Sequence, residues 1–318
     1  MTKEIFHVVI TRFSIRMHPD RGFRGRSKDW LFDEHRLTQK LSLFEHVSFS
    51  SISKGSEQPD LLLVLIDPEL PKDIRRKLEN IISPYSWANT LEVSPGALAN
   101  MRSLGSLLGH LSIKSELILT TNLDDDDAIG AQYILNLKTL VKRHQIDRPR
   151  QPFHWFGSID MQEWDLLPSN EAPLGFVKPY SGGVMFVLSV GFSVLTKNNP
   201  NAPSIFTLSH SRCLDFLTRK HRRANYDRKG RFKFRLSLAL RSLKMGSWGA
   251  ALGIIRGSDY ATRLDAGGSG EFQGLIINHG DNLQSGRIKS GSNKRKPAKH
   301  NTMMANYNID ARKAIQPF

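Results

Sequence analysis

Four consecutive aspartates, Asp124 to Asp127, are the residues of this sequence with the clearest potential for chemistry. Adjacent carboxylates repel one another strongly, so a run of four requires compensation by positive charge. The N-terminus of a following helix is one source of such charge, and a divalent cation held by carboxylate oxygens is another. The run directly follows the apolar segment 117–121, and open α/β sheets bind ligands beyond the carboxyl ends of their strands.

The spacing within the run selects a pair of side chains. If the chain is locally extended, side chains two residues apart point the same way, so Asp124 and Asp126 can reach one metal ion. Asp127 is then a helix cap or a ligand through water, and Asp125 points elsewhere. The alternative is an acidic cap on a solvated turn. Four carboxylates directly after a buried strand favour the metal site, with Mn²⁺ or Mg²⁺ as the cation.

The elements that must position these residues follow from hydrophobic periodicity. Apolar runs predict strands over 6–10, 61–66, 91–93, 117–121, 153–159 and 184–190. Apolar stripes predict helices over 71–82, 97–111 and 129–141, the last beginning just after the aspartates. Strands that alternate with helices predict an α/β fold with a Rossmann-like, mostly parallel sheet flanked by helices.

Composition and charge indicate how the chain is divided. It has 318 residues and a net charge of +15, and its one cysteine excludes an internal disulfide. Residues 212–245 hold twelve Lys or Arg against two Asp, and from 286 Gly, Ser, Lys and Arg predominate. We therefore expect a ligand-binding half over 1–145, a second half over 146–285 and a basic flexible tail over 286–318. Since no apolar run is long enough to span a membrane and the start lacks the pattern of a signal peptide, we expect a cytoplasmic protein, with peripheral contact to the anionic inner face of the membrane left open.

Three segments resemble a known family. The segment LILTTNLDDDDAI (117–129) is similar to the Asp-rich segment of the rhamnosyltransferase family of bacterial nucleotide-sugar glycosyltransferases, which have the A-type glycosyltransferase fold. The first strand resembles that family's first strand in ending on Thr11, Arg12 and Phe13. LLLVLIDPELP (61–71) resembles its second strand, with Asp67 at the end. The resemblance covers the first half of the chain, up to residue 145, and fades afterwards.

The resemblance implies transfer of a sugar, rhamnose in the family's name, from a nucleotide-sugar donor to a saccharide, a polysaccharide precursor or a lipid-linked glycan. It implies that Mn²⁺ or Mg²⁺ joins Asp124 and Asp126 to the donor diphosphate, with Asp127 as a further metal ligand. Such an ion stabilises the charge that develops on the departing nucleoside diphosphate. Thr11, Arg12, Asp67 and Asp124 are the residues expected at the donor. For Arg12 a surface position, and for Asp67 a turn before Pro68, are equal alternatives.

The chain also departs from the family. It has Asn122 where the family has Arg, and Arg256 where a late His would complete the metal shell. His210 and His279 are the substitutes for that third ligand.

The second half contains the candidates for acceptor chemistry. An inverting transfer needs a general base on the acceptor hydroxyl, and Asp160, Glu163 and Asp165 follow a predicted strand; Asp160 is preferred. A surface carboxylate is the ordinary alternative for each. Trp155 and Trp164 would stack on a sugar or lie buried in the core.

Two other functions compete with the transferase. The basic charge favours a nucleic-acid-binding protein with metal-dependent nuclease chemistry, but no nucleic-acid-binding motif is present and no nucleic acid is expected as a partner. Arg256 keeps open a degenerate transferase homologue that binds sugars without turnover.

Overall fold

The fold is known from a computed structural model that describes residues 4–16, 27–99, 101–147, 153–158, 161–166, 169–179, 190–202, 204–206, 261–264, 274–278 and 296–316. Within them, the strands form two sheets. No helix among these residues is long and apolar enough to cross a lipid bilayer. The strand predicted over 184–190 lies almost wholly outside the described residues.

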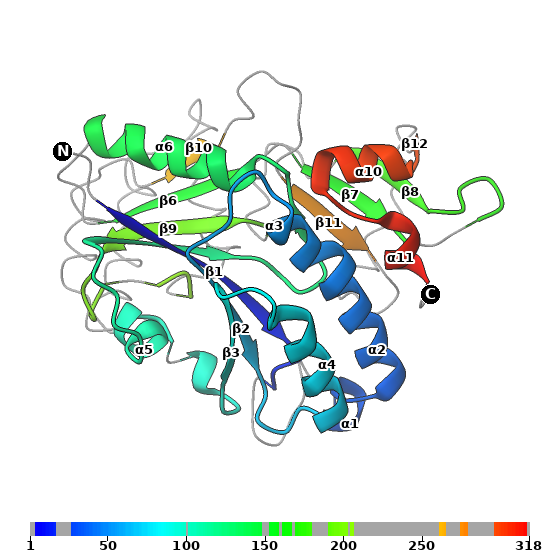
Figure 1. Cartoon of the computed structure of the whole chain (residues 1–318), viewed down its shortest axis with the longest axis horizontal. Coiled ribbons are helices and arrows are strands. Elements are labelled where there is room, and N and C mark those ends of the chain that lie inside the picture. The colour runs from blue at the N-terminus through cyan, green and yellow to red at the C-terminus, as the bar shows by residue number, and fades with distance from the viewer. Residues whose placement is uncertain are drawn as a thin grey trace, which may run out of the picture.

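The larger sheet contains the strands predicted for the first half. Its members are β1 (Ile5–Phe13), β2 (Leu61–Ile66), β3 (Ala88–Glu92), β4 (Leu117–Asn122), β6 (Phe153–Ser158), β9 (Phe192–Lys197) and β10 (Ala261–Leu264). Their order is β10-β6-β9-β4-β1-β2-β3 (Figure 1). β1 runs parallel to β2 and β4, and β2 parallel to β3, whereas β9 is antiparallel to both of its neighbours. The predicted α/β fold with a Rossmann-like, mostly parallel sheet is confirmed.

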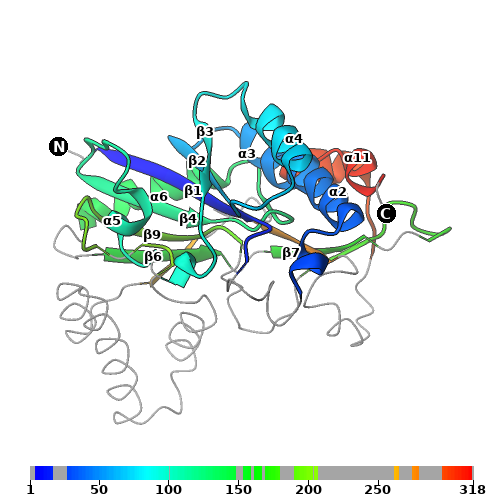
Figure 2. The same ribbon diagram turned by 90° about the horizontal axis from the view of Figure 1, so that it is seen from below.

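Helices cover both faces of this sheet, as the fully buried β2 and β4 require. The helices are α1 (Lys28–Leu31), α2 (Glu34–Leu43), a π turn η1 (Phe44–Phe49), α3 (Ser50–Ser53), α4 (Lys72–Ile82), a 3₁₀ turn η2 (Ala97–Ala99), α5 (Leu104–Leu108), α6 (Tyr133–Asp147), α10 (His300–Tyr307) and α11 (Ala311–Ile315). One face packs against α2, α4 and α6, and the other against α5. In both views α2 and α4 lie side by side near the end of β1 (Figure 1, Figure 2).

The smaller sheet joins the two halves of the chain. It consists of β5 (Ala128–Ile129), β7 (Met161–Asp165), β8 (Phe176–Pro179), β11 (Gly274–Asn278) and β12 (Lys296–Pro297), in the order β12-β8-β7-β11-β5. β5 follows the aspartates directly and pairs with β11. The aspartate run therefore connects the larger sheet, where β4 ends, to the smaller sheet, where β5 begins.

Two helix predictions need correction. The helix expected from Ile129 begins at Tyr133, because Ala128 and Ile129 pair with β11 instead. The helix expected over 97–111 is divided into η2 and α5, because Ser103 caps a new helix: its hydroxyl accepts a hydrogen bond from the Ser106 backbone N–H at 3.2 Å. The helix predicted from Pro71 is confirmed as α4, with Ile74 on its buried stripe.

The prediction of a flexible tail over 286–318 is wrong for residues 296–316. These residues form β12, α10 and α11, and α10 and α11 lie beside the smaller sheet (Figure 1). Met303, Tyr307 and Ile309 are buried in a cluster with residues of η1, β5, β7 and β11. The basic composition near 286–295 concealed the apolar residues that follow it.

Candidate functional site

The four aspartates form a tight turn just beyond β4: Asp125 and Asp126 are its central residues, and the Asp127 N–H donates to the Asp124 carbonyl at 3.2 Å. Within β4 the side chains alternate, with Leu117 and Leu119 on the α2 face of the sheet and Ile118 on the α5 face, but the turn ends this alternation before the quartet. Asp125 and Asp127 are buried, at 4% and 5% exposure, whereas Asp124 and Asp126 are partly exposed. The expected pairing of Asp124 with Asp126 assumed an extended chain, and the structure has a turn instead, so the binding of one metal ion by both side chains stays a prediction.

Asp124 is held by the predicted strand-end arginine. Arg12, at the end of β1, donates from Nη2 to Asp124 Oδ1 at 2.8 Å, and the two side chains are 28% and 31% exposed. The contact forms because β1 and β4 are adjacent and parallel, so their carboxyl ends meet. Burial lowers the pKa of Arg12, but the negative charge of Asp124 outweighs this effect and the pKa is raised overall. Sequence reasoning placed both residues at the donor, and the structure brings them together.

Asp125 is held by a lysine that sequence reasoning missed. Lys40, on α2, donates to Asp125 Oδ1, and its Nζ lies 3.7 Å from Asp126 Oδ2. Burial lowers the pKa of Lys40, but the charges of Asp125 and Asp126 raise it overall. Burial also raises the pKa of Asp125, an effect that Lys40 opposes. The second oxygen of Asp125 is buried without a hydrogen-bond partner among the described residues.

Asp127 faces the smaller sheet. Its Oδ1 accepts a hydrogen bond from the backbone N–H of Ile277, in β11, at 3.1 Å. Burial and then the charges of Asp126 and Asp124 raise the pKa of Asp127 well above its usual value. The expected helix cap is not its role, since β5 and not a helix follows it. Its placement favours a structural part for Asp127, and its role as a metal ligand stays a prediction.

One long helical segment contacts the aspartate loop, which is residues 123–127 between β4 and β5, and its flanks at several points. α2, η1 and α3 follow one another without a break from Glu34 to Ser53. From this segment Lys40 reaches Asp125, the Ser48 hydroxyl donates to the Asp124 carbonyl at 3.2 Å, and the Ser51 hydroxyl accepts from the Ile129 N–H at 3.3 Å. π turns inside helices are frequent at functional sites. The loop is thus held from both its ends by one element.

The carboxylates of Asp124 and Asp126 are of the kind that binds a divalent cation. Carboxylate oxygens are the ligands that Mg²⁺ and Mn²⁺ prefer, and the side chains of Asp124 and Asp126 are 31% and 15% exposed. In the described part of the chain, no group of three His, Cys, Asp or Glu side chains is arranged to hold a metal ion. A cation at Asp124 and Asp126 would therefore take its remaining ligands from outside the described residues, for example from a bound diphosphate and water.

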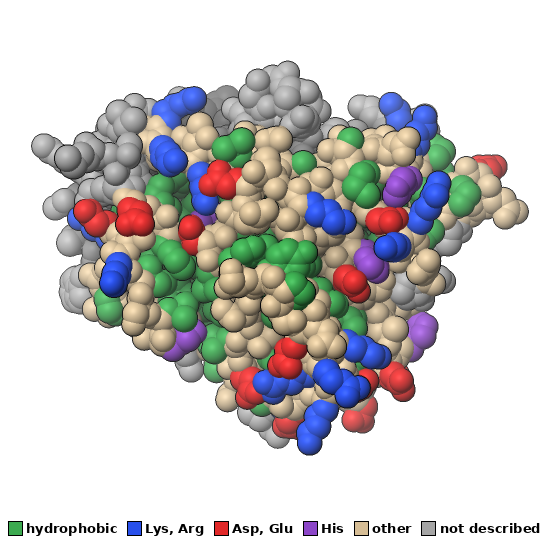
Figure 3. Space-filling model, viewed as in Figure 1, with side chains coloured by type: hydrophobic (Ala, Val, Ile, Leu, Met, Phe, Trp, Pro, Cys, Tyr) green, Lys and Arg blue, Asp and Glu red, His purple; other side chains and the backbone are tan. Residues whose placement is uncertain are grey.

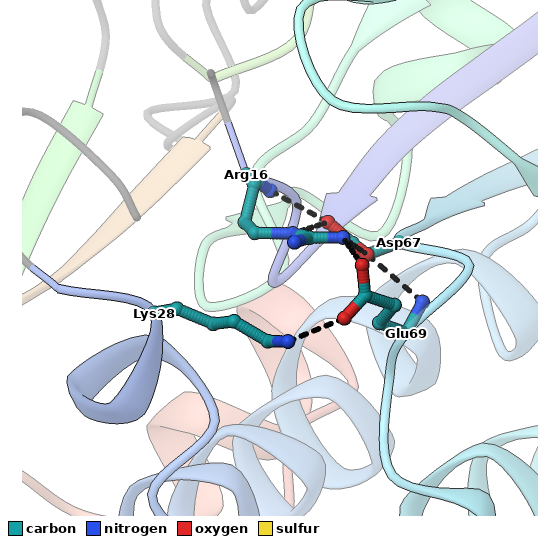
Figure 4. A network of polar contacts seen from close by, with 4 residues as sticks. All are labelled: Arg16, Lys28, Asp67 and Glu69. Atoms are coloured by element: carbon teal, nitrogen blue, oxygen red, sulfur yellow. Dashed lines mark hydrogen bonds and ion pairs between the residues drawn. The ribbon is translucent and has the colours of Figure 1, made fainter. Parts of the chain in front are cut away.

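The other two predicted donor residues lie on the neighbouring strands. Thr11 is fully buried, and its hydroxyl has no hydrogen-bond partner among the described residues. Asp67 is also fully buried, and it accepts hydrogen bonds from Arg16 Nε and Nη2, both at 2.9 Å (Figure 4). Glu69 joins the same network by binding Arg16 and Lys28. Asp67 therefore anchors the segment that follows β1, and its contact with a nucleotide stays a prediction.

Most of the acceptor-side candidates lie outside the described residues. This holds for Asp160, the preferred general base, for Arg256, His210 and His279, and for the basic block 212–245. Trp164 is buried in the core, where its indole N–H donates to the Leu174 carbonyl at 2.7 Å, so the core alternative is confirmed for it. On the face shown in Figure 3, Lys and Arg side chains are interspersed with Asp and Glu, so the basic excess of the chain forms no single patch in the described part of this face.

A comparison with known protein families supports the resemblance that the sequence showed. Residues 7–151 match the sequence model of a family described as "Putative rhamnosyl transferase". The resemblance to this family is confirmed over that segment. It contains β1, β2, β4 and the aspartate loop, which are the segments that carried the resemblance. No curated protein matches the chain in sequence.

Solved structures similar to the chain include two glycosyltransferases. Staphylococcus aureus TarS 1–349 in complex with UDP-GlcNAc has 10% sequence identity, a TM-score of 0.36, and covers 90% of this chain. The chain in turn spans 61% of that TarS chain. The apo form of mouse xyloside xylosyltransferase 1 has 11% identity and a TM-score of 0.33, covering 82% of this chain and 86% of its own.

Proposed function

We propose that this protein is a glycosyltransferase that takes a sugar from a nucleotide-sugar donor. The observation that carries the proposal is the partly exposed pair Asp124 and Asp126 just beyond the carboxyl end of β4, within the segment that matches the rhamnosyltransferase family. This is the edge at which open α/β sheets bind their ligands. The family description supports rhamnose as the sugar, and a saccharide or lipid-linked glycan is the acceptor in keeping with it.

The residues of the site have different proposed roles. Asp124 and Asp126 would hold Mn²⁺ or Mg²⁺ against the donor diphosphate, and the ion would supply Lewis-acid stabilisation of the leaving group. Arg12 lies at the same edge, 2.8 Å from Asp124, so its guanidinium can neutralise either this carboxylate or a phosphate. Asp125 and Asp127 keep the loop in place from its buried side. Asp160 remains the proposed general base on the acceptor.

Thermal unfolding with nucleotides tests the proposal. We expect UDP, dTDP or GDP to raise the Tm when Mn²⁺ is present and not when it is absent. A ligand at 100 times its Kd stabilises the native state by about 2.7 kcal/mol. Stabilisation by duplex DNA instead, lost at moderate salt, would favour the nucleic-acid-binding alternative.

Asp126→Asn assigns this binding to the site. We expect this variant to fold and to lose the Mn²⁺-dependent shift, because the pair then has one carboxylate left. Asp73→Asn is the matched control, since Asp73 is exposed on α4. If Asp126→Asn binds as well as the wild type, the site is assigned wrongly. Product detection with a panel of nucleotide sugars then identifies the donor.

A further inference from the structure

Lys40 is the charged side chain of the site that neither the aspartate spacing nor the family resemblance assigns. It extends from α2 to the buried side of the aspartate loop, and only 13% of its side chain is exposed. Its ammonium binds Asp125 and lies 3.7 Å from Asp126 Oδ2. A fixed positive charge thus lies beneath the pair that is expected to hold a divalent cation.

The charges around this lysine determine what the site can attract. The quartet carries four carboxylates, and Arg12 and Lys40 form ion pairs with Asp124 and with Asp125 and Asp126. Together these six side chains carry a formal charge of −2, whereas the four carboxylates alone carry −4. A free divalent cation would meet the repulsion of Lys40 a few ångströms away, in a partly buried setting where such repulsion is strong.

The helical segment that carries Lys40 is bound to the aspartate loop and its flank at two further points. The same helical segment that carries Lys40 also binds the loop backbone through Ser48, at the Asp124 carbonyl, and through Ser51, at the Ile129 N–H. The π turn lies between Lys40 and Ser51 and includes Ser48, so one continuous helical segment carries all three contacts. Any shift of Lys40 that follows the helix therefore also moves the aspartates.

We propose that Lys40 is a positioning residue that keeps the affinity of Asp124 and Asp126 for a free divalent cation low. The cation then enters together with the nucleoside diphosphate, whose negative charge outweighs the repulsion of Lys40. The proposal rests on the proposed function and deepens it, because it assigns an order of binding to the same site. Asp125 serves in this arrangement to fix the lysine.

Mn²⁺ binding to three variants tests this inference. Free Mn²⁺ is measured by electron paramagnetic resonance, without nucleotide and with UDP, dTDP or GDP. Lys40→Met removes the charge and keeps the stem, whereas Lys40→Arg keeps the charge. Lys138→Met is the matched control, because Lys138 is similarly buried, at 15% exposure, but pairs with Glu57.

The inference predicts a specific pattern. In the wild type, the nucleotide tightens Mn²⁺ binding at least tenfold. Lys40→Met binds Mn²⁺ without nucleotide about tenfold more tightly than the wild type does, because the repulsive charge is gone. Lys40→Arg and Lys138→Met stay within about twofold of the wild type. A folded Lys40→Met variant with unchanged Mn²⁺ affinity would overturn the inference, and so would an equal change in Lys138→Met.

Asp125→Asn keeps the inference testable if Lys40→Met does not fold. This variant leaves the whole charge of Lys40 acting on Asp126, so Mn²⁺ binding in the presence of nucleotide should weaken about tenfold. Unchanged binding in Asp125→Asn overturns the inference. If no nucleotide alters Mn²⁺ binding by the wild type, the proposed function itself fails. If the wild type shows this coupling and the variants resemble it, only the role of Lys40 fails.

Discussion

At the scale of single residues, Asp67 shows how the chain stabilises a charge that it buries completely. Its carboxylate accepts hydrogen bonds from the Arg16 side chain, from the Arg16 backbone N–H at 3.1 Å and from the Glu69 backbone N–H at 2.9 Å. The ion pairs with Asp67 and Glu69 raise the pKa of Arg16. This pair fixes the backbone just beyond β1, where Ser14 has a left-handed conformation with φ 48°.

Removing one partner of this pair should destabilise the fold strongly. We expect Arg16→Met to lower the free energy of unfolding by about 3–5 kcal/mol, because Asp67 would remain buried without its counter-charge. Unfolding in urea measures this loss. Arg75→Met is the control: Arg75 pairs with Glu79 and Glu92 at the surface, where such pairs contribute about 1 kcal/mol or less. Equal losses in both variants would show that Asp67 does not depend on Arg16.

At the scale of elements, a chain of polar side chains joins three strands inside the larger sheet. The buried His7, in β1, shares a hydrogen bond of 2.8 Å with the Thr121 hydroxyl in β4, which lies 2.6 Å from the Ser193 hydroxyl in β9. Burial, with a smaller contribution from Lys138, lowers the pKa of His7 to about 3. The imidazole is therefore neutral in the folded protein at pH values above about 3.

This histidine should make the fold sensitive to mild acid. In the unfolded chain His7 regains a pKa near 6.5, so below that pH the unfolded state binds a proton that the folded state does not. Stability is then lost as the pH falls from 6.5 toward 3, by up to about 1.4 kcal/mol per pH unit. We expect His7→Leu to flatten this part of the stability profile, and substitution of the exposed His35 by Gln to leave it unchanged. Parallel profiles for His7→Leu and wild type would contradict the prediction.

The elements also show where sequence reasoning succeeds and where it stops. The strands with continuous apolar runs, such as Leu61–Ile66, were predicted at their observed positions because burial on both faces leaves a local signal. The carboxyl ends of adjacent parallel strands had to meet, so Arg12 and the aspartates could be placed together. Lys40 could not, because its contact with Asp125 spans 85 residues and depends on how α2 packs. The pairing of Ala128 with β11 is equally non-local, and it replaced the expected helix start.

At the scale of the whole molecule, the C-terminal segment ties the two halves of the chain together. The Asn306 carbonyl accepts from the Ala131 N–H at 2.8 Å, and the Asn308 carbonyl accepts from the Ser50 hydroxyl at 2.8 Å. Tyr307 is fully buried between these contacts, and its hydroxyl donates to Gln162 in β7 at 3.0 Å. Ala131 lies only four residues beyond Asp127, so this segment also supports the loop that carries the candidate site.

Substitution of Tyr307 tests whether residues 296–316 contribute to the stability of the whole fold. We expect Tyr307→Ala to lower the free energy of unfolding by about 3–5 kcal/mol, because a large buried ring is replaced by a cavity. Lys299→Ala, at an exposed position just before α10, should change it by less than about 0.5 kcal/mol. Tyr307→Phe keeps the ring and loses the hydroxyl that donates to Gln162, so its loss should be about 1 kcal/mol. Unfolding in denaturant measures the free energy of unfolding of the three variants. If Tyr307→Ala unfolds in the same transition as the wild type, residues 296–316 are not part of the cooperative fold. The C-terminal segment contacts both the smaller sheet and the chain next to the aspartate loop. If Tyr307→Ala lowers the stability of the whole fold, Mn²⁺-dependent nucleotide binding should weaken as well. If only the C-terminal segment unfolds, that binding should stay intact.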